Sequence, residues 1–169
     1  MAVHLLVTQL RFTRAELMRC LAGVGELEAR RRFKPMNSIS WIIGHLADQE
    51  NRYWVKLAQG QLLFPELNAL VGHGQPASTP PLDQVLHAWS AITAAADPYL
   101  DTLSPALLQT HLEWEGRVLP DRIGTMLQRN IYHYWFHLGE VYAIRQLLGH
   151  GNLPEFVGDM SGAPYHPEE

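Results

Sequence analysis

Four long stretches of this sequence place apolar residues at three- and four-residue steps, the spacing that gathers them on one face of an α-helix. The stretches cover about residues 6–24, 39–60, 82–100 and 121–148. An amphipathic helix is stable mainly when its apolar face packs against another element. The sequence therefore predicts an all-α fold, a four-helix bundle built from these helices.

The connection between the second and third predicted helices is long. Residues 61–81 interrupt the helical pattern with Pro65, Pro76 and the pair Pro80-Pro81. A short loop makes neighbouring helices antiparallel, whereas a connection of this length can travel back along a bundle. We therefore expect a long crossover between helices 2 and 3, which lets these two helices run in the same direction.

The chain length of 169 residues is typical of one domain. We expect residues 1–150 to form the bundle and residues 151–169, which contain several prolines and glycines, to form a C-terminal tail. Residues 113–120, between the third and fourth helices, predict a turn flanked by extended backbone.

Charge and composition argue against several classes of partner. The net charge is −4, and the one basic cluster, Arg30-Arg31-Arg32 with Lys34, is interpreted as a solvated turn between helices. Such a short cluster does not match the extended phosphate backbone of a nucleic acid. Nucleic-acid binding is therefore not expected.

The sequence also argues against a membrane or secreted protein. It has no run of about 18 uninterrupted apolar residues, the length that a membrane-spanning helix needs. Residues 1–10 lack the features of a secretory signal, and the single cysteine, Cys20, cannot form an internal disulfide. These observations predict a cytoplasmic protein.

Two histidines four residues apart suggest a metal site on the fourth predicted helix. His133 and His137 share one helix face, where Cβ atoms at this spacing lie about 5–6 Å apart. His45, on the second helix, is the candidate for a third ligand. Three neutral imidazoles can bind zinc, nickel, copper or iron and leave coordination positions open. The alternative is that each histidine is a hydrogen-bonded core or boundary residue.

Two carboxylates lie close to these histidines in the helical pattern. Glu50 falls inside the apolar stripe of the second helix, where an unpaired carboxylate would be costly. It is interpreted either as a proton carrier or ligand-orienting group beside the metal, or as the partner of Arg145 or another buried donor. Glu140 lies one turn beyond His137 and could orient a ligand, act as a base, or be an exposed helix charge.

The fourth predicted helix carries more aromatic surface than one core would cover. Tyr132, Tyr134, Trp135 and Phe136 occupy most of its circumference. Charged residues make up only 18% of the chain, below the average of about 25% for soluble domains. A homodimer is therefore expected, although the connection at 61–81 and the C-terminal tail could also cover this surface.

Two motifs in this sequence resemble those of the DinB superfamily, which includes YfiT-like metal-dependent hydrolases and bacillithiol- or mycothiol-dependent transferases. They are NSISWIIGHLADQE at residues 37–50 and HYWFHLGE at residues 133–140. The resemblance covers about residues 1–150. It implies a four-helix bundle, often a homodimer, in which His45, His133 and His137 bind nickel or zinc. Asn130 departs from the family pattern, because many relatives have another histidine at that position.

Two kinds of function follow from these observations and from the resemblance. The first is a metal-dependent enzyme in which the ion activates a small-molecule thiol or water for S-transfer or hydrolysis of an electrophilic substrate. The second is a non-catalytic, stress-related metal-binding or protein-interaction module. A di-iron carboxylate site is not expected, because such sites use Glu-x-x-His pairs on two helices and this sequence has none.

Overall fold

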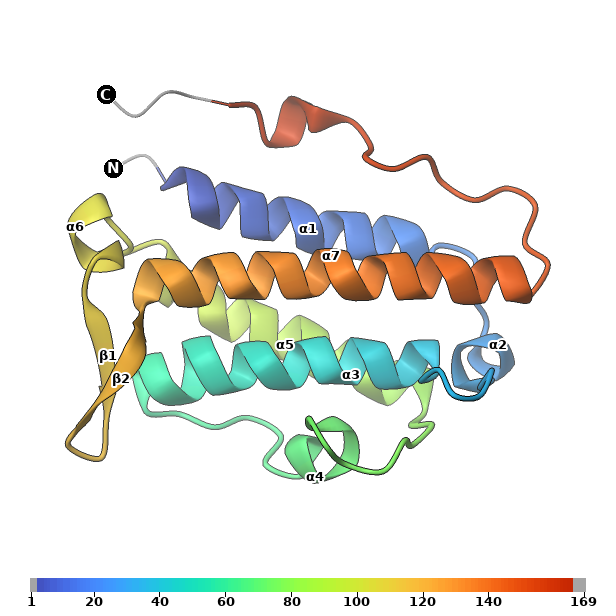
Figure 1. The fold of residues 1–169 in the computed structure, drawn as a ribbon, viewed down its shortest axis with the longest axis horizontal. Helices are drawn as coiled ribbons and strands as arrows, with labels where there is room; N and C mark the ends of the chain where they lie inside the picture. Colours follow the sequence, from blue (N-terminus) through green and yellow to red (C-terminus); the bar gives the residue numbers. More distant parts are fainter. Residues whose placement is uncertain (1–2, 166–169) are drawn as a thin grey trace.

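The computed structural model describes residues 3–165, which are mostly helical with one two-stranded antiparallel sheet. The long elements are four helices that lie side by side, and short helices and a hairpin connect them (Figure 1). In chain order the elements are α1 (Leu5–Leu21), α2 (Glu26–Arg30), α3 (Ile39–Glu50), the π-helical η1 (Asn51–Leu57), α4 (Leu67–Val71), α5 (Leu82–Leu100), α6 (Pro105–Leu108), β1 (His111–Trp114), β2 (Arg117–Arg122), α7 (Ile123–Leu147) and the 3₁₀ turn η2 (Met160–Gly162).

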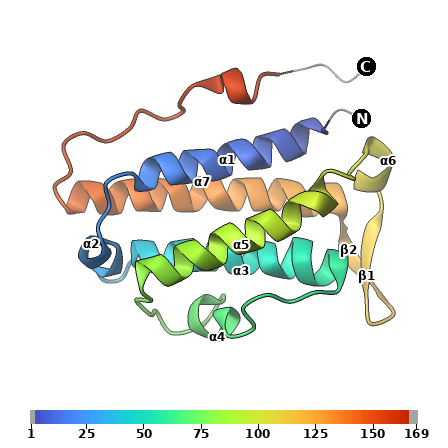
Figure 2. The same cartoon turned by 180° about the vertical axis from the view of Figure 1, so that it is seen from behind.

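The packing order of the long helices decides which side chains can meet. α1 packs on α7, and α3 packs on both α5 and α7. α3 and α5 run in the same direction, and the connection that contains α4 returns along the outside of α3 (Figures 1 and 2). Residues on facing sides of α3 and α7 therefore lie close together in the middle of the molecule.

The core consists of the apolar stripes of these four helices. Ser38 starts α3, because its Oγ accepts a hydrogen bond from the backbone N–H of Trp41 at 3.2 Å. Burial of each large aliphatic side chain contributes about 1.5–3 kcal/mol. The largest fully buried aliphatic side chains are Leu10, Leu17, Ile39, Ile42, Ile43, Leu46, Ile92, Leu100, Leu127 and Ile144.

A glycine in α3 lets the crossover approach closely. A Cβ atom at Gly44 would lie 3.2 Å from side-chain carbons of Val71 in α4 and Val85 in α5. Glycine in a helix interior costs about 1 kcal/mol relative to alanine. The close approach that it permits brings the backbone of Val71 next to His45, the residue that follows Gly44.

The short elements differ from the sequence-based expectations. The basic cluster at Arg30-Arg31-Arg32 was expected to be a turn, but Arg30 ends helix α2 and pairs with Glu26 at 3.1 Å. The connection at 61–81 contains the five-residue helix α4. The second long helix continues beyond Glu50 as π-helix, and the fourth begins at Ile123 because the two preceding residues belong to β2.

The turn predicted at residues 113–120 is the tip of the β1–β2 hairpin, with Glu115 and Gly116 both at positive φ.

The tail folds back beside α1 (Figure 1). There Gly158 donates its N–H to Glu16 at 3.0 Å, and Gln9 donates to the carbonyl of Ala163 at 3.2 Å. Residues 151–165 therefore cover part of the helical body. Within the described range, no helix is both long and apolar enough to cross a membrane.

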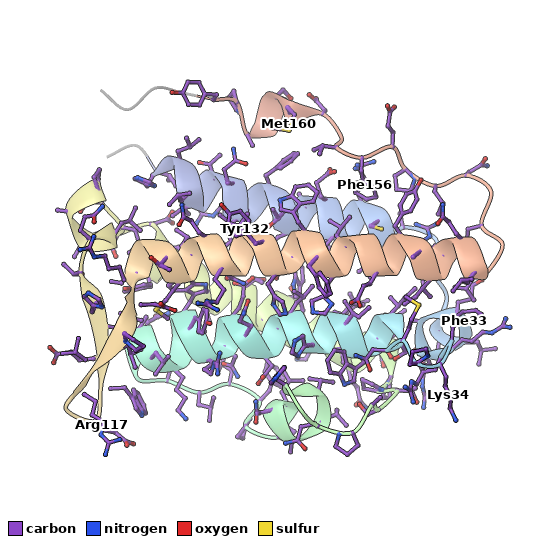
Figure 3. All side chains as sticks on the ribbon, in the orientation of Figure 1. Phe33, Lys34, Arg117, Tyr132, Phe156 and Met160 are labelled. Atoms are coloured by element: carbon purple, nitrogen blue, oxygen red, sulfur yellow. The ribbon has the colours of Figure 1, made fainter. Side chains whose placement is uncertain are left out.

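The aromatic residues of α7 fall into two groups. Tyr134 is fully buried, and the half-buried Trp135 packs on Phe12 of α1 with ring centroids 6.2 Å apart. Tyr132 and Phe136 remain 66% and 63% exposed on the outer face of α7, where Figure 3 labels Tyr132. The tail covers another face of α7, where Phe156 packs on Tyr142. A homodimer that buries Tyr132 and Phe136 stays a prediction.

Candidate metal centre

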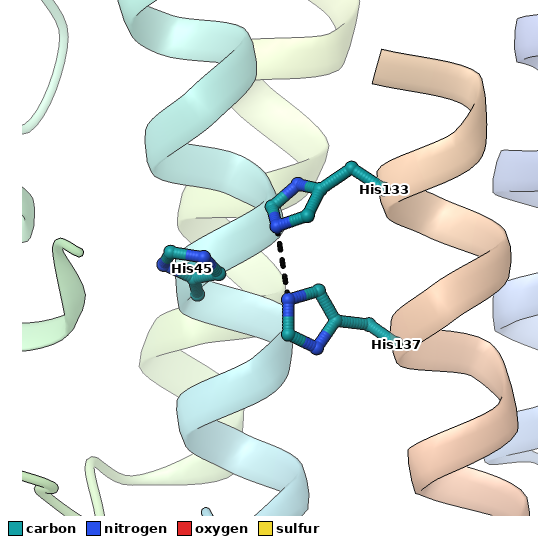
Figure 4. Close-up of side chains that lie close together, drawn as sticks. All are labelled: His45, His133 and His137. Carbon is teal, nitrogen blue, oxygen red and sulfur yellow. Dashed lines mark hydrogen bonds between the residues drawn. The ribbon is translucent and has the colours of Figure 1, made fainter. Parts of the chain in front are cut away.

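Three histidines from two helices converge between α3 and α7, as the sequence predicts. Each offers a nitrogen atom, and these three atoms lie within 4.8 Å of one another. His45 projects from α3 toward His133 and His137 of α7 (Figure 4). The ring centroids are 4.5–5.2 Å apart. This cluster is compatible with a divalent metal site, because tetrahedral zinc binds histidine nitrogens at about 2.0–2.1 Å.

Backbone and ring contacts fix the orientation of His45. Its Nδ1 lies 2.8 Å from the carbonyl oxygen of Val71, which can only accept a hydrogen bond. The proton of the neutral ring is therefore on Nδ1, and the lone pair is on Nε2. The indole of Trp41 stacks on the imidazole with centroids 4.5 Å apart and an angle of 18°. Burial is the main cause that lowers the pKa of His45, which favours the neutral ring.

Glu140 orients His137 in the same way. The Nδ1 atom of His137 donates to Oε2 of Glu140 at 2.6 Å, one turn along α7. A carboxylate that accepts from Nδ1–H places the lone pair of the neutral ring on Nε2 and raises its basicity as a ligand. Of the roles that the sequence analysis left open for Glu140, this contact favours the ligand-orienting one, which stays a prediction.

A chain of hydrogen bonds that sequence reasoning missed determines the tautomer of His133. Trp54 Nε1, which can only donate, bonds Asn130 Oδ1 at 2.7 Å. The Asn130 amide therefore donates from Nδ2 to Gln49 Oε1 at 2.9 Å. The same Gln49 oxygen lies 2.9 Å from His133 Nδ1, so this nitrogen must donate. His133 is left with its lone pair on Nε2.

In all three histidines the lone pair is consequently on Nε2. The Nε2 atoms of His133 and His137 are 2.9 Å apart, as the dashed line in Figure 4 marks. When both rings are neutral, two lone pairs face each other at this distance. Burial, followed by the charges of His137 and His45, lowers the pKa of His133 to about 3, so a proton on His133 does not relieve the contact near neutral pH. A shared cation would make this approach favourable, and three imidazole nitrogens are a donor set that divalent transition ions accept.

Glu50 is paired with buried donors other than Arg145. Its fully buried carboxylate accepts two hydrogen bonds from Arg14 of α1, including Nε to Oε1 at 2.9 Å, and one from the Tyr134 hydroxyl at 2.6 Å. The suggested pairing with Arg145 is wrong, because Arg145 donates to the carbonyl of Cys20 and to His150. The structure matches the other alternative, a different buried donor, which is Arg14. Within residues 3–165, no hydrogen bond joins Glu50 to a histidine.

A polar cavity of about 470 Å³ lies beside the histidine cluster. His45 and His133 form part of its wall, and its charged lining consists of Asp48, Arg52 and Arg129. His73, from the long crossover, also lines this cavity, although the sequence analysis gave it no role. A volume of this size suits a small-molecule ligand.

Comparison with known families supports the resemblance stated above. The family model of the DinB superfamily matches residues 9–141, which is more than half of the chain and includes all three histidines. A search of curated proteins gave no significant match. The extent of the family match shows that this chain belongs to the DinB superfamily.

Proposed function

We propose that this chain is a metal-dependent enzyme in which His45, His133 and His137 bind one divalent transition ion, zinc or nickel. The observation that carries the proposal is the convergence of three histidine nitrogens within 4.8 Å of one another, on rings whose Nδ1 atoms each contact a hydrogen-bond acceptor. The reaction proposed is S-transfer or hydrolysis, with a small-molecule thiol or an electrophilic compound as substrate. A divalent ion with three neutral ligands lowers the pKa of a thiol or water that reaches its open position.

The roles of the chain's own residues follow from their contacts. Glu140 holds His137 in its ligand tautomer, and Gln49 does the same for His133. Glu50 supports the site indirectly, because it accepts from the hydroxyl of Tyr134, the residue next to His133. We further propose that α1, α3, α5 and α7 form the four-helix bundle of the superfamily, and that the protein is cytoplasmic.

A second candidate function uses the outer face of α7. Tyr132 and Phe136 are one turn apart and are among the most exposed large hydrophobic side chains of residues 3–165. Aromatic pairs of this kind are common in protein interfaces. This pair supports the alternative of a non-catalytic interaction module or a homodimer contact, with an ion that serves only stability.

Elemental analysis of purified protein tests the proposal. The wild type should contain about one zinc or nickel ion per chain, and the His45→Ala, His133→Ala and His137→Ala variants should lose it. The matched control is His111→Ala, since this exposed histidine lies in the hairpin and contacts Leu119. A screen of thiols with electrophiles should show activity that disappears with the metal.

Two results would count against the enzyme. Activity that persists in a metal-free His137→Ala variant would contradict the metal mechanism. An ion whose removal lowers the melting temperature, in a protein inactive on every thiol and electrophile tested, would favour the non-catalytic alternative.

A further inference from the structure

A groove of about 550 Å³ lies between α7 and the C-terminal tail, and its volume suits a small organic molecule. Its α7 side consists of Trp135, Leu138, Gly139 and Tyr142, which share one helix face because they follow the i, i+3, i+4, i+7 spacing. The three histidines of the candidate metal centre are not among its lining residues. The groove is therefore a separate site from the histidine cluster.

Gly139 leaves the middle of this groove open. A Cβ atom at Gly139 would meet no neighbouring residue of the described chain within 4 Å, in contrast to the close contacts at Gly44. Glycine is a poor helix former in a helix interior, and the packing of this chain does not require one at position 139. The seven-residue interval from Trp135 to Tyr142 spans about 10 Å along the helix. The space over Gly139 is thus available to a flat or slender ligand of about this length.

Aromatic rings from two segments border the open space. Phe156 of the tail, labelled in Figure 3, packs on Tyr142 with ring centroids 5.5 Å apart and an angle of 71°. Trp135 is half-buried, with one side against Phe12 of α1. Aromatic rings offer apolar surface to a ligand body and a negative face to a cation.

The charge at the groove is negative. Glu155 is the one charged residue among the described lining residues, and no ion pair within residues 3–165 includes it. The neighbouring cation is Arg19, whose guanidinium lies 4.8 Å from the ring centre of Phe156. Arg19 pairs with Glu16 at 2.6 Å and binds the backbone carbonyl of Glu155. Two carboxylates therefore share one guanidinium, and residues 151–165 contain no lysine or arginine.

We infer that this groove binds a small organic amine. Its aromatic or alkyl body lies over Gly139 between Trp135 and Tyr142, and its ammonium group is directed at the carboxylate of Glu155. An ammonium group is attracted by aromatic faces and by a carboxylate, whereas Glu155 repels an anionic ligand. The inference assigns a second ligand site that does not depend on the metal.

Three probes with the same apolar body separate charge from apolar contact. Calorimetry at low ionic strength would give the dissociation constants of phenylbutylamine, phenylbutanol and phenylbutyrate for the purified wild-type chain. The amine should bind at least about fivefold more tightly than the alcohol, because its charge adds to the apolar contact. The acid should bind more weakly than the alcohol.

Gly139→Leu tests the place of binding. The leucine side chain should fill the open space and weaken amine binding at least about tenfold. Leucine is the better helix former and meets no neighbour there, so the variant should melt at or above the temperature of the wild type.

Glu155→Gln tests the charge without removing the backbone contact to Arg19. It should reduce the preference for the amine over the alcohol to about twofold or less. The matched control is Glu113→Gln, which changes the net charge equally at an exposed position of β1 and should leave the preference unchanged.

Each contrary result has a definite meaning. Amine binding that is absent from the wild type, or undiminished in Gly139→Leu, overturns the site. Equal affinity for the amine and the alcohol, or an equal loss of preference in Glu155→Gln and Glu113→Gln, overturns the assignment of an organic cation as the ligand.

Discussion

At the scale of single residues, Gln49 determines which nitrogen of His133 faces the other histidines. Its side-chain oxygen accepts from both Asn130 and His133, and Trp54 fixes the orientation of Asn130. Asn130, the departure from the family pattern, is therefore a hydrogen-bonding residue behind the candidate site. The sequence predicted the three histidines because helical spacing places two of them together. It could not predict this chain of contacts, because its members meet only when α3, η1 and α7 pack.

Replacing Gln49 should weaken metal binding while all three histidines remain. In Gln49→Leu, the Nδ1 proton of His133 and the Asn130 amide lose their acceptor, so zinc affinity should fall about 10–100-fold. Gln49→Glu keeps an acceptor at the same position and is the matched control, with affinity at or above that of the wild type. Competition with a chromophoric chelator measures both. Equal zinc affinity of the Leu variant and the wild type would show that Gln49 does not tune His133.

Cys20 should be unreactive in the folded protein. Burial raises the pKa of its thiol to about 11, and the residue is fully buried in α1. At pH 8 almost no thiolate is present and reagent cannot reach it, so alkylation by iodoacetamide should be slow in buffer and fast in urea. Mass spectrometry follows the modification. Rapid labelling of the native protein would mean that Cys20 is accessible and could itself act as a nucleophile.

At the scale of elements, one buried polar network connects all four long helices. Arg14 of α1 contacts Glu50 of α3 and, at 2.8 Å, Asp97 of α5. Tyr134 of α7 donates to Glu50 and accepts from Trp89 of α5 at 2.8 Å. Burial, followed by the charge of Glu50, raises the pKa of Tyr134, so its hydroxyl stays protonated and can donate. The network fixes α3 relative to α7, the two helices that carry the histidines.

Removing the cation of this network should destabilise the fold strongly. Arg14→Met leaves the Glu50 carboxylate buried without its partner and should lower the free energy of unfolding by about 3–5 kcal/mol. The double variant Arg14→Met/Glu50→Gln removes the unpaired charge and should recover part of that loss. Urea unfolding measures both variants. A double variant that is less stable than Arg14→Met alone would mean that the unpaired charge is not the cause.

The long elements were predictable and the short ones were not. The stripe from Leu82 to Leu100 gives the bounds of α5, because a five-turn periodic pattern is unambiguous. The five-residue helices α2 and α4 are too short to show a period. The apolar pattern through Tyr53 and Trp54 also does not reveal the π-helical hydrogen bonding of η1. The sequence analysis named Arg145 but not Arg14 as a partner of Glu50, because only the packing of the helices shows which buried donor meets this carboxylate.

At the scale of the whole molecule, the candidate metal site links α3 to α7. An ion bound only by the folded state stabilises that state by an amount that grows with the logarithm of its concentration relative to its dissociation constant. Zinc at 100 times its dissociation constant should add about 2.7 kcal/mol to the free energy of unfolding.

For a chain of this length, that gain should raise the melting temperature by about 5–11 °C. Scanning calorimetry of metal-free and zinc-loaded protein measures the shift. The His137→Ala variant is the control and should show no shift. An equal shift in that variant would place the stabilising ion elsewhere.

The most direct measurement is anomalous X-ray diffraction from crystals of the zinc-loaded protein at the zinc absorption edge. The account predicts one strong peak about 2.0–2.1 Å from the Nε2 atoms of His45, His133 and His137, with the Nδ1 atoms still bonded to Val71, Gln49 and Glu140. A peak bound through the Nδ1 atoms, or none near the three rings, would contradict it.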